Sequence, residues 1–133
     1  MYGLRATREA NTNGHVDITT EAEHTYPVVR RLVEAKIYRS PSYHVQGLHQ
    51  LILRYSTGRE GRGWLVNYVR QNNIKGIVCS LREHLDSNKP CDQKGESRDH
   101  TITWWFASTH RHNSGEDIEV VHASCNLFTD ATE

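Results

Sequence analysis

Hydrophobic and polar positions near the start of the chain predict a β-hairpin. Residues 12–20 carry apolar side chains only at Val16 and Ile18, whereas residues 28–38 are rich in β-branched side chains. The turn-like segment 21–27 lies between these two runs. Residues 1–10 give a weaker signal, which leaves open an additional strand before the hairpin.

Two helices and a strand are predicted in the middle of the chain. Ser40 followed by Pro41 is a typical helix start, and this helix should end near Gly58. Its apolar positions recur every three or four residues, at Val45, Leu48, Leu51, Ile52 and Tyr55. The second helix is marked by Ile74, Ile77, Val78, Leu81 and Leu85. Residues 63–69 between them predict a short, mostly buried strand.

The remainder of the chain predicts a polar loop and two further strands. Residues 91–99 are polar and are expected to be exposed, and strands are expected at residues 100–108 and 117–128. In the last strand the apolar positions change parity, which predicts a bulge near Val120. The resulting order of elements predicts an α/β (α+β mixed) fold in which a central mixed β-sheet is flanked by helices.

Length and composition indicate one soluble globular domain, residues 1–133. Hydrophobic residues are 36% and charged residues 24%, with a mean hydropathy of −0.71. No run of about 18 apolar residues is present, and the first ten residues lack the apolar stretch of a signal peptide. We therefore expect a cytoplasmic protein that does not contact membranes. The three cysteines include no CxxC pair, which argues against a disulfide framework or a zinc ribbon.

Positive charge is concentrated in the middle of the chain. The formal net charge is zero, but residues 30–70 contain eight basic and two acidic residues. Such a segment could contact the phosphates of a nucleic acid. The alternative is that these arginines are solvated surface residues.

Glu34 and Lys36 are two residues apart in a predicted strand and so share one of its faces. If the hairpin turn is centred between Thr25 and Tyr26, Asp17 lies directly opposite Glu34. Two carboxylates beside a lysine can bind Mg²⁺ and help water attack a phosphodiester. The alternative is a surface ion-pair cluster. The apolar residues around Glu34 favour the first interpretation, since burying a charge is costly.

The same residues resemble the PD-(D/E)xK (restriction-endonuclease-like) nuclease superfamily, in particular bacterial domains that occur as modules of larger defence-associated proteins. The resemblance covers roughly residues 5–85. It is carried by residues 9–18, 33–39 and 49–60. The sequence contains, in order, Asp17, the triplet Glu34-Ala35-Lys36 and a helix that bears Gln50. The resemblance implies a restriction-endonuclease-like fold.

The resemblance also implies roles for these residues. Asp17 and Glu34 would be ligands of Mg²⁺ or Mn²⁺, with the carbonyl oxygen of Ala35 as a further ligand, and Lys36 would be the catalytic lysine. The proline of the founding motif is absent, since Val16 precedes Asp17. Two further positions match an acidic residue and a polar helix residue that belong to the site, and these are Glu9 and Gln50.

The function implied is a metal-dependent nuclease that hydrolyses phosphodiester bonds in DNA, as an effector domain in bacterial anti-phage defence. A homodimer would be needed for double-strand cleavage, and an additional sensor domain or partner protein is expected. The alternative is a catalytically inactive module that binds nucleic acid or protein. Candidate phosphate contacts are Arg39, Arg54, Arg59 and Arg62.

Histidines and aromatic residues late in the chain suggest two other hypotheses. His110 and His112 would share one face of a strand and, together with His122, could form the site of a zinc hydrolase. The spacing relates only the first two and does not fix a third ligand, so exposed or hydrogen-bonded histidines are favoured. The run 104–106, Trp-Trp-Phe, could stack on unpaired bases. Core packing is favoured, because neighbouring strand residues face opposite ways.

Overall fold

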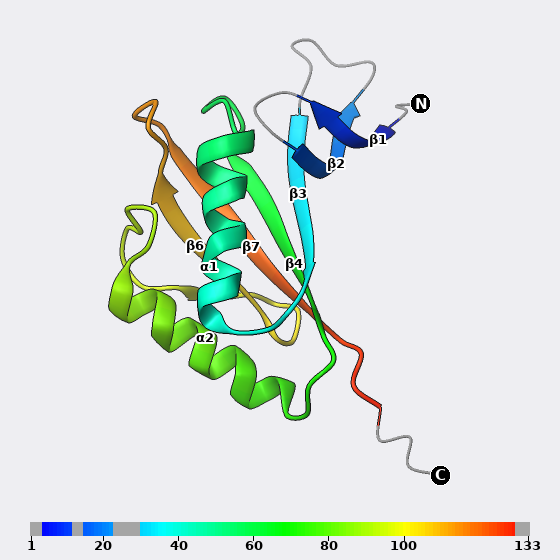
Figure 1. The fold of residues 1–133 in the computed structure, drawn as a ribbon. Helices are drawn as coiled ribbons and strands as arrows, with labels where there is room; N and C mark the ends of the chain where they lie inside the picture. Colours follow the sequence, from blue (N-terminus) through cyan, green and yellow to red (C-terminus); the bar gives the residue numbers. More distant parts are fainter. Residues whose placement is uncertain (1–3, 12–14, 23–29, 130–133) are drawn as a thin grey trace.

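The computed structural model describes residues 4–11, 15–22 and 30–129, with side chains for residues 32–54 and 56–129. Seven strands form one mixed sheet in the order β1-β2-β3-β4-β7-β6-β5 (Figure 1). The strands are β1 (Leu4–Asn11), β2 (His15–Ala22), β3 (Arg30–Ile37), β4 (Arg62–Val69), β5 (Arg98–Asp99), β6 (Trp105–Arg111) and β7 (Asp117–Asn126). The helices are α1 (Pro41–His49), its π-helical continuation η1 (Gln50–Tyr55), and α2 (Ile74–Asn88).

The direction of the strands changes across the sheet. β1, β2 and β3 are antiparallel neighbours, whereas β3, β4 and β7 run parallel to one another. β6 is antiparallel to β7, and β5 to β6. The helical segment α1–η1 makes the connection from β3 to β4 that a parallel pair requires. The predicted mixed α/β sheet is confirmed, with β1 as the additional strand that the sequence left open.

Local capping explains where both helices begin. The Ser40 hydroxyl accepts a hydrogen bond from the Tyr43 N–H at 3.2 Å, and Pro41 occupies the first turn of α1. Asn73 caps α2 through its side chain, which accepts a hydrogen bond from the Gly76 N–H. Both predicted helices are confirmed. None of the helices in the described part of the chain is long and apolar enough to cross a membrane.

Both helices pack on the same face of the sheet. His44 of α1 contacts His122 of β7, and Arg82 of α2 lies over the Phe106 ring of β6. Phe106 and His122 stack with ring centroids 4.3 Å apart, so the two contacts share one face. The buried apolar core lies between this face and the helices. It contains Leu32, Tyr38, Leu48, Leu51, Ile52, Leu65, Val69, Ile74, Val78, Leu81, Leu85, Phe106, Ile118 and Val120.

Two predictions about the late strands were wrong. β7 pairs without interruption with β4 and β6, so it contains no bulge at Val120. The change in parity arises because this central strand is buried on both faces, as Val121 and Ala123 show. The preceding strand begins at Trp105 and not at residue 100, since Trp104 has φ +67 and ends a turn. Core packing is confirmed for Phe106, whereas Trp104 is exposed.

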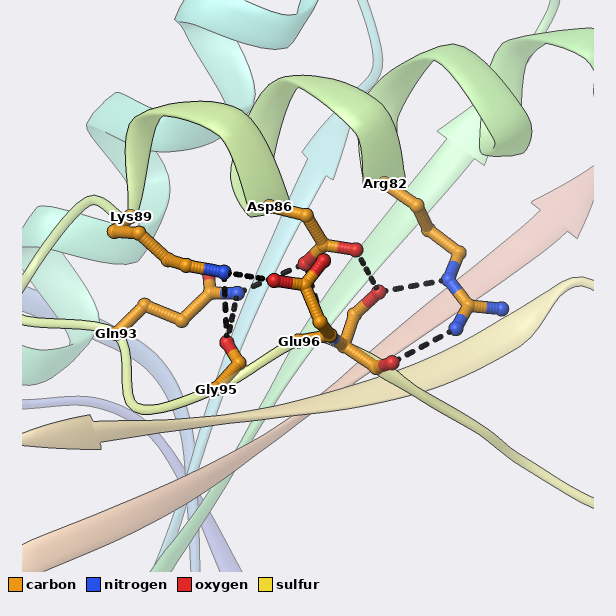
Figure 2. Close-up of polar contacts among 7 residues, drawn as sticks. Arg82, Asp86, Lys89, Gln93, Gly95 and Glu96 are labelled. Atoms are coloured by element: carbon orange, nitrogen blue, oxygen red, sulfur yellow. Dashed lines mark hydrogen bonds and ion pairs between the residues drawn. The ribbon is translucent and has the colours of Figure 1, made fainter.

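The polar segment 91–99 is mostly exposed, as predicted, but α2 binds it and two of its residues are buried (Figure 2). The Asp86 carboxylate accepts hydrogen bonds from Gln93 Nε2 at 2.9 Å and from the N–H and hydroxyl of Ser97 at 2.8 and 2.9 Å. Arg82 donates to the Ser97 hydroxyl and carbonyl, and Lys89 pairs with Glu96. Gln93 and Ser97 are therefore buried at 8% exposure each, despite the polarity of the segment.

Candidate active site

Glu34 and Lys36 form a buried ion pair on β3. Lys36 Nζ lies 3.5 Å from Glu34 Oε2, and their side chains are 16% and 6% exposed, respectively. Both side chains lie on the face covered by the helices. Glu34 is buried on the same face of the strand as Leu32, and the Lys36 side chain contacts α1. The acid and the base that the sequence places on one face of a strand are thus brought together at the edge of the core.

Helix α1 provides a seat for the Lys36 side chain. Its ammonium group lies 5.0 Å from the centroid of the Tyr43 ring, a distance at which cation–π attraction operates. A Cβ atom at Gly47 would lie only 2.8 Å from Lys36 Cε and 3.0 Å from Cδ. Gly47 therefore leaves room for the Lys36 side chain to lie against the surface of α1. Sequence reasoning missed both residues, although a glycine inside a helical pattern is a sign of such a close approach.

The register of β2 on β3 matches the predicted hairpin. Four pairs, from Ile18–Val33 to Glu21–Arg30, follow the expected alignment, and the next positions along the two strands are Asp17 and Glu34. The centre of the predicted turn, between Thr25 and Tyr26, lies outside the described residues.

Glu9 belongs to the same row of positions. The pairs Arg8–Ile18 and Ala10–Val16 flank it, so Glu9 lies opposite Asp17 in the β1–β2 ladder. Three acidic positions, on three neighbouring strands, thus follow one another across the sheet. The side chains of Glu9 and Asp17 lie outside the described residues. Among the described side chains, no three His, Cys, Asp or Glu residues come together in a way that could hold a metal ion.

The other predicted site residues are placed as follows. Ala35 lies between Glu34 and Lys36 and pairs in register with Val66. Gln50 is half-buried at the start of η1, and in the described part of the chain no hydrogen bond joins it to Lys36. The Tyr55 side chain, expected in the core, lies outside the described residues.

The four candidate phosphate-binding arginines differ in their surroundings. Arg39 is exposed, and its guanidinium carbon lies 4.9 Å from the centroid of the Tyr43 ring that also holds Lys36. Arg54 and Arg59 are exposed. Arg62 is paired with Glu119 at 2.7 Å, so part of its charge is already balanced. Arg39 is therefore the arginine that the fold connects to the Glu34–Lys36 pair.

A chain of buried polar side chains crosses the sheet beneath α1. Asn67 Nδ2 lies 2.8 Å from His44 Nδ1, and His44 Nε2 lies 2.8 Å from His122 Nδ1. Ser108 Oγ is 2.7 Å from both His122 Nε2 and His110 Nε2. All five residues are 2% exposed or less. We call this set the histidine chain.

The hydrogen bonds of the histidine chain have one consistent set of directions when all three imidazoles are neutral. His110 Nδ1 lies 2.9 Å from the Pro90 carbonyl oxygen, which only accepts, so His110 Nδ1–H donates. His110 Nε2 then accepts from the Ser108 hydroxyl, whose oxygen accepts from His122 Nε2–H. His122 Nδ1 in turn accepts from His44 Nε2–H. His44 Nδ1 is then an acceptor, and it accepts from Asn67 Nδ2–H at 2.8 Å, although Asn67 Oδ1 also lies 3.1 Å from this nitrogen.

Burial favours the same neutral state. It lowers the pKa of His44 from 6.5 to about 4. It also lowers the pKa of His110 and takes that of His122 well below its ordinary value. His112 lies apart, donating to the Ser56 carbonyl at 3.2 Å. The interpretation of the late histidines as hydrogen-bonded residues is confirmed, and the described side chains offer no zinc site.

Comparison with known proteins adds no relative to this description. No protein-family model matches the chain, and neither a curated protein nor a solved structure does. Function is therefore inferred from the geometry of β3 and its neighbours and from the order of the motif residues.

Proposed function

We propose that this protein is a metal-dependent nuclease that hydrolyses phosphodiester bonds in DNA. The observation that carries the proposal is the buried Glu34–Lys36 ion pair. Glu34 directly follows the residues of β3 that pair with β2, and Asp17 is the corresponding next position of β2. Replacing a buried ion pair with apolar residues is often neutral or stabilising, so such a pair is weak as a device for stability alone. A catalytic use accounts for its position between the core and α1.

The residue types proposed for this site suit a hard divalent cation. Asp17 and Glu34 would hold Mg²⁺ or Mn²⁺ with the carbonyl oxygen of Ala35, since these ions prefer oxygen ligands. Glu9 is the next acidic position in the same row. When bound, the ion would supply an activated water and charge neutralisation at the phosphate.

Lys36 would act on the substrate itself. Its ammonium group would donate a hydrogen bond to a phosphate oxygen and stabilise the negative charge that develops during hydrolysis. The seat formed by Tyr43 and Gly47 fixes the direction from which that group approaches. Gln50 would approach from the helical side. We include three further expectations in the same proposal: the protein acts as an effector in anti-phage defence, it forms a homodimer, and it works with an additional sensor domain or partner protein.

Plasmid digestion with Mg²⁺ or Mn²⁺ tests this function. Wild type should cleave, and Glu34→Gln and Lys36→Met should each lower the rate by at least about 10²-fold. Glu83→Gln, which changes an exposed glutamate of α2, is the matched control and should cleave like wild type. Each variant is assayed below its own melting temperature. Equal cleavage by all four proteins removes the assignment, and DNA binding without cleavage under either ion favours the inactive module.

A further inference from the structure

A cavity of about 370 Å³ opens where β3 and β4 lead into the two helices. It lies at the carboxyl ends of these parallel strands, which is where open α/β sheets commonly bind ligands. Its polar lining includes Tyr38, Arg39, Ser40, Asn72 and Ser80. None of the described residues that line it is acidic, so the cavity offers one cation and several hydrogen-bonding groups to an anion.

Arg39 connects this cavity to the proposed catalytic lysine. It lines the cavity, and its guanidinium group lies over the same Tyr43 ring as the ammonium group of Lys36. Among the described residues Arg39 has no acidic partner, in contrast to Arg62, which binds Glu119. Two cations thus lie near one ring; Lys36 pairs with Glu34, and Arg39 lines the cavity.

Tyr38 supplies a second, independent feature. It lines the cavity, and its hydroxyl makes no hydrogen bond within the described part of the chain, so this group is available to a bound ligand. Burial raises the pKa of this phenol, so it stays a hydrogen-bond donor at neutral pH. An anionic oxygen in the cavity would accept a hydrogen bond from it.

We infer that this cavity binds a phosphate group of the nucleic-acid strand, next to the phosphate that Lys36 contacts. The inference rests on the proposed nuclease function. Arg39 would bind the phosphate through its planar guanidinium fork, and the Tyr38 hydroxyl would donate to a third oxygen. Lys36 and Tyr38 are two residues apart, about 6.6 Å along an extended chain. A nucleic-acid strand with one phosphate at Lys36 can therefore place the next phosphate along its backbone in the cavity.

Binding of a short single-stranded DNA oligonucleotide without divalent ions tests the inference separately from cleavage. Affinity is measured by fluorescence anisotropy for wild type, Arg39→Gln, Tyr38→Phe and Arg111→Gln. The last variant removes an exposed arginine at the end of β6, outside the cavity, and matches the charge change of Arg39→Gln. We expect Arg39→Gln to weaken binding about tenfold and Tyr38→Phe about fivefold, with less than about a twofold change for Arg111→Gln.

Inorganic phosphate, added as a competitor, should displace the oligonucleotide from wild type more effectively than from Arg39→Gln. Equal weakening by Arg39→Gln and Arg111→Gln would mean that only overall charge matters and would overturn the inference. Wild-type affinity in Tyr38→Phe would overturn it as well, and this variant removes a single oxygen and so should fold. If the variants behave as expected but wild type never cuts DNA, the phosphate site stands and the nuclease function falls.

Discussion

Acid is expected to unfold this protein through its buried histidines before it affects the carboxylates. His44 is 1% exposed, and burial lowers its pKa from 6.5 to about 4. Between these two pH values the unfolded chain takes up a proton that the folded chain excludes, so the free energy of unfolding falls as the pH falls. Each pH unit is worth about 1.4 kcal/mol, so His44 alone removes about 3 kcal/mol by about pH 4.

The other buried histidines act in the same direction, whereas the carboxyl groups act later. Burial lowers the pKa of His110 and His122 as well, so each adds to the loss of stability. Burial alone would raise the pKa of Glu60 and Asp86, but their hydrogen bonds outweigh it and lower both. Their stabilising effect is present above their ordinary values of 4.5 and 3.8 and is lost below them. Any loss of stability above the pH range in which these carboxyl groups take up protons therefore comes from the histidine chain.

Urea unfolding followed by tryptophan fluorescence, from about pH 7.5 to about pH 4.5, measures this effect. His44→Gln breaks the chain and should cost about 1–3 kcal/mol at neutral pH, and it should lose the share of the pH dependence that protonation of residue 44 contributes. His49→Gln changes an exposed histidine at the end of the same helix and should keep the wild-type slope. A wild-type slope in His44→Gln would refute the neutral chain. So would a wild-type loss below about 1 kcal/mol between pH 6.5 and pH 4.5.

Three further outcomes are expected. Gly47→Ala should lower plasmid cleavage about tenfold by displacing Lys36. Its melting temperature should stay nearly unchanged, because the higher helix propensity of alanine contributes up to about 1 kcal/mol and offsets the cost of moving the lysine. Gly61→Ala, with open space around it, should change neither quantity. Asp86→Ala should lower the free energy of unfolding by about 2–3 kcal/mol and speed proteolysis within residues 91–99, and wild-type stability would contradict this role. Calorimetric titration with Mg²⁺ should show binding to wild type and none to Glu34→Gln, and equal binding would remove Glu34 from the ligand set.

Much of the central fold could be predicted because local signals and tertiary structure agree there. Ser40 and Pro41 set the start of α1 through capping, which involves only neighbours in the chain. The register of β2 on β3 could be derived because a short hairpin connection fixes the alignment of its strands. The positions of Glu34 and Lys36 on one face followed from the period of a strand alone.

Other features depend on contacts between distant segments and left no local signal. His44 bonds to Asn67, 23 residues away, and to His122, 78 residues away, so no spacing rule connects them. The parity of β7 was misleading because burial on both faces arises from its central place in the sheet. The polarity of residues 91–99 predicted the exposure of most of the segment but not the burial of Gln93 and Ser97, since nothing in that segment indicates that Asp86 would bind it.

Helix α1 links the histidine chain to the proposed active site. Its residue His44 is hydrogen-bonded to Asn67, and Asn67 is the register partner of Lys36 in the parallel β3–β4 pair. The residues on either side of that anchor, Tyr43 and Gly47, form the seat of the lysine. Protonation of the chain would weaken the anchor and the seat together, because one helix carries both. Cleavage by wild type should therefore fall with acid over the same pH range as stability, and His44→Gln should lower cleavage at neutral pH although residue 44 has no part in the chemistry.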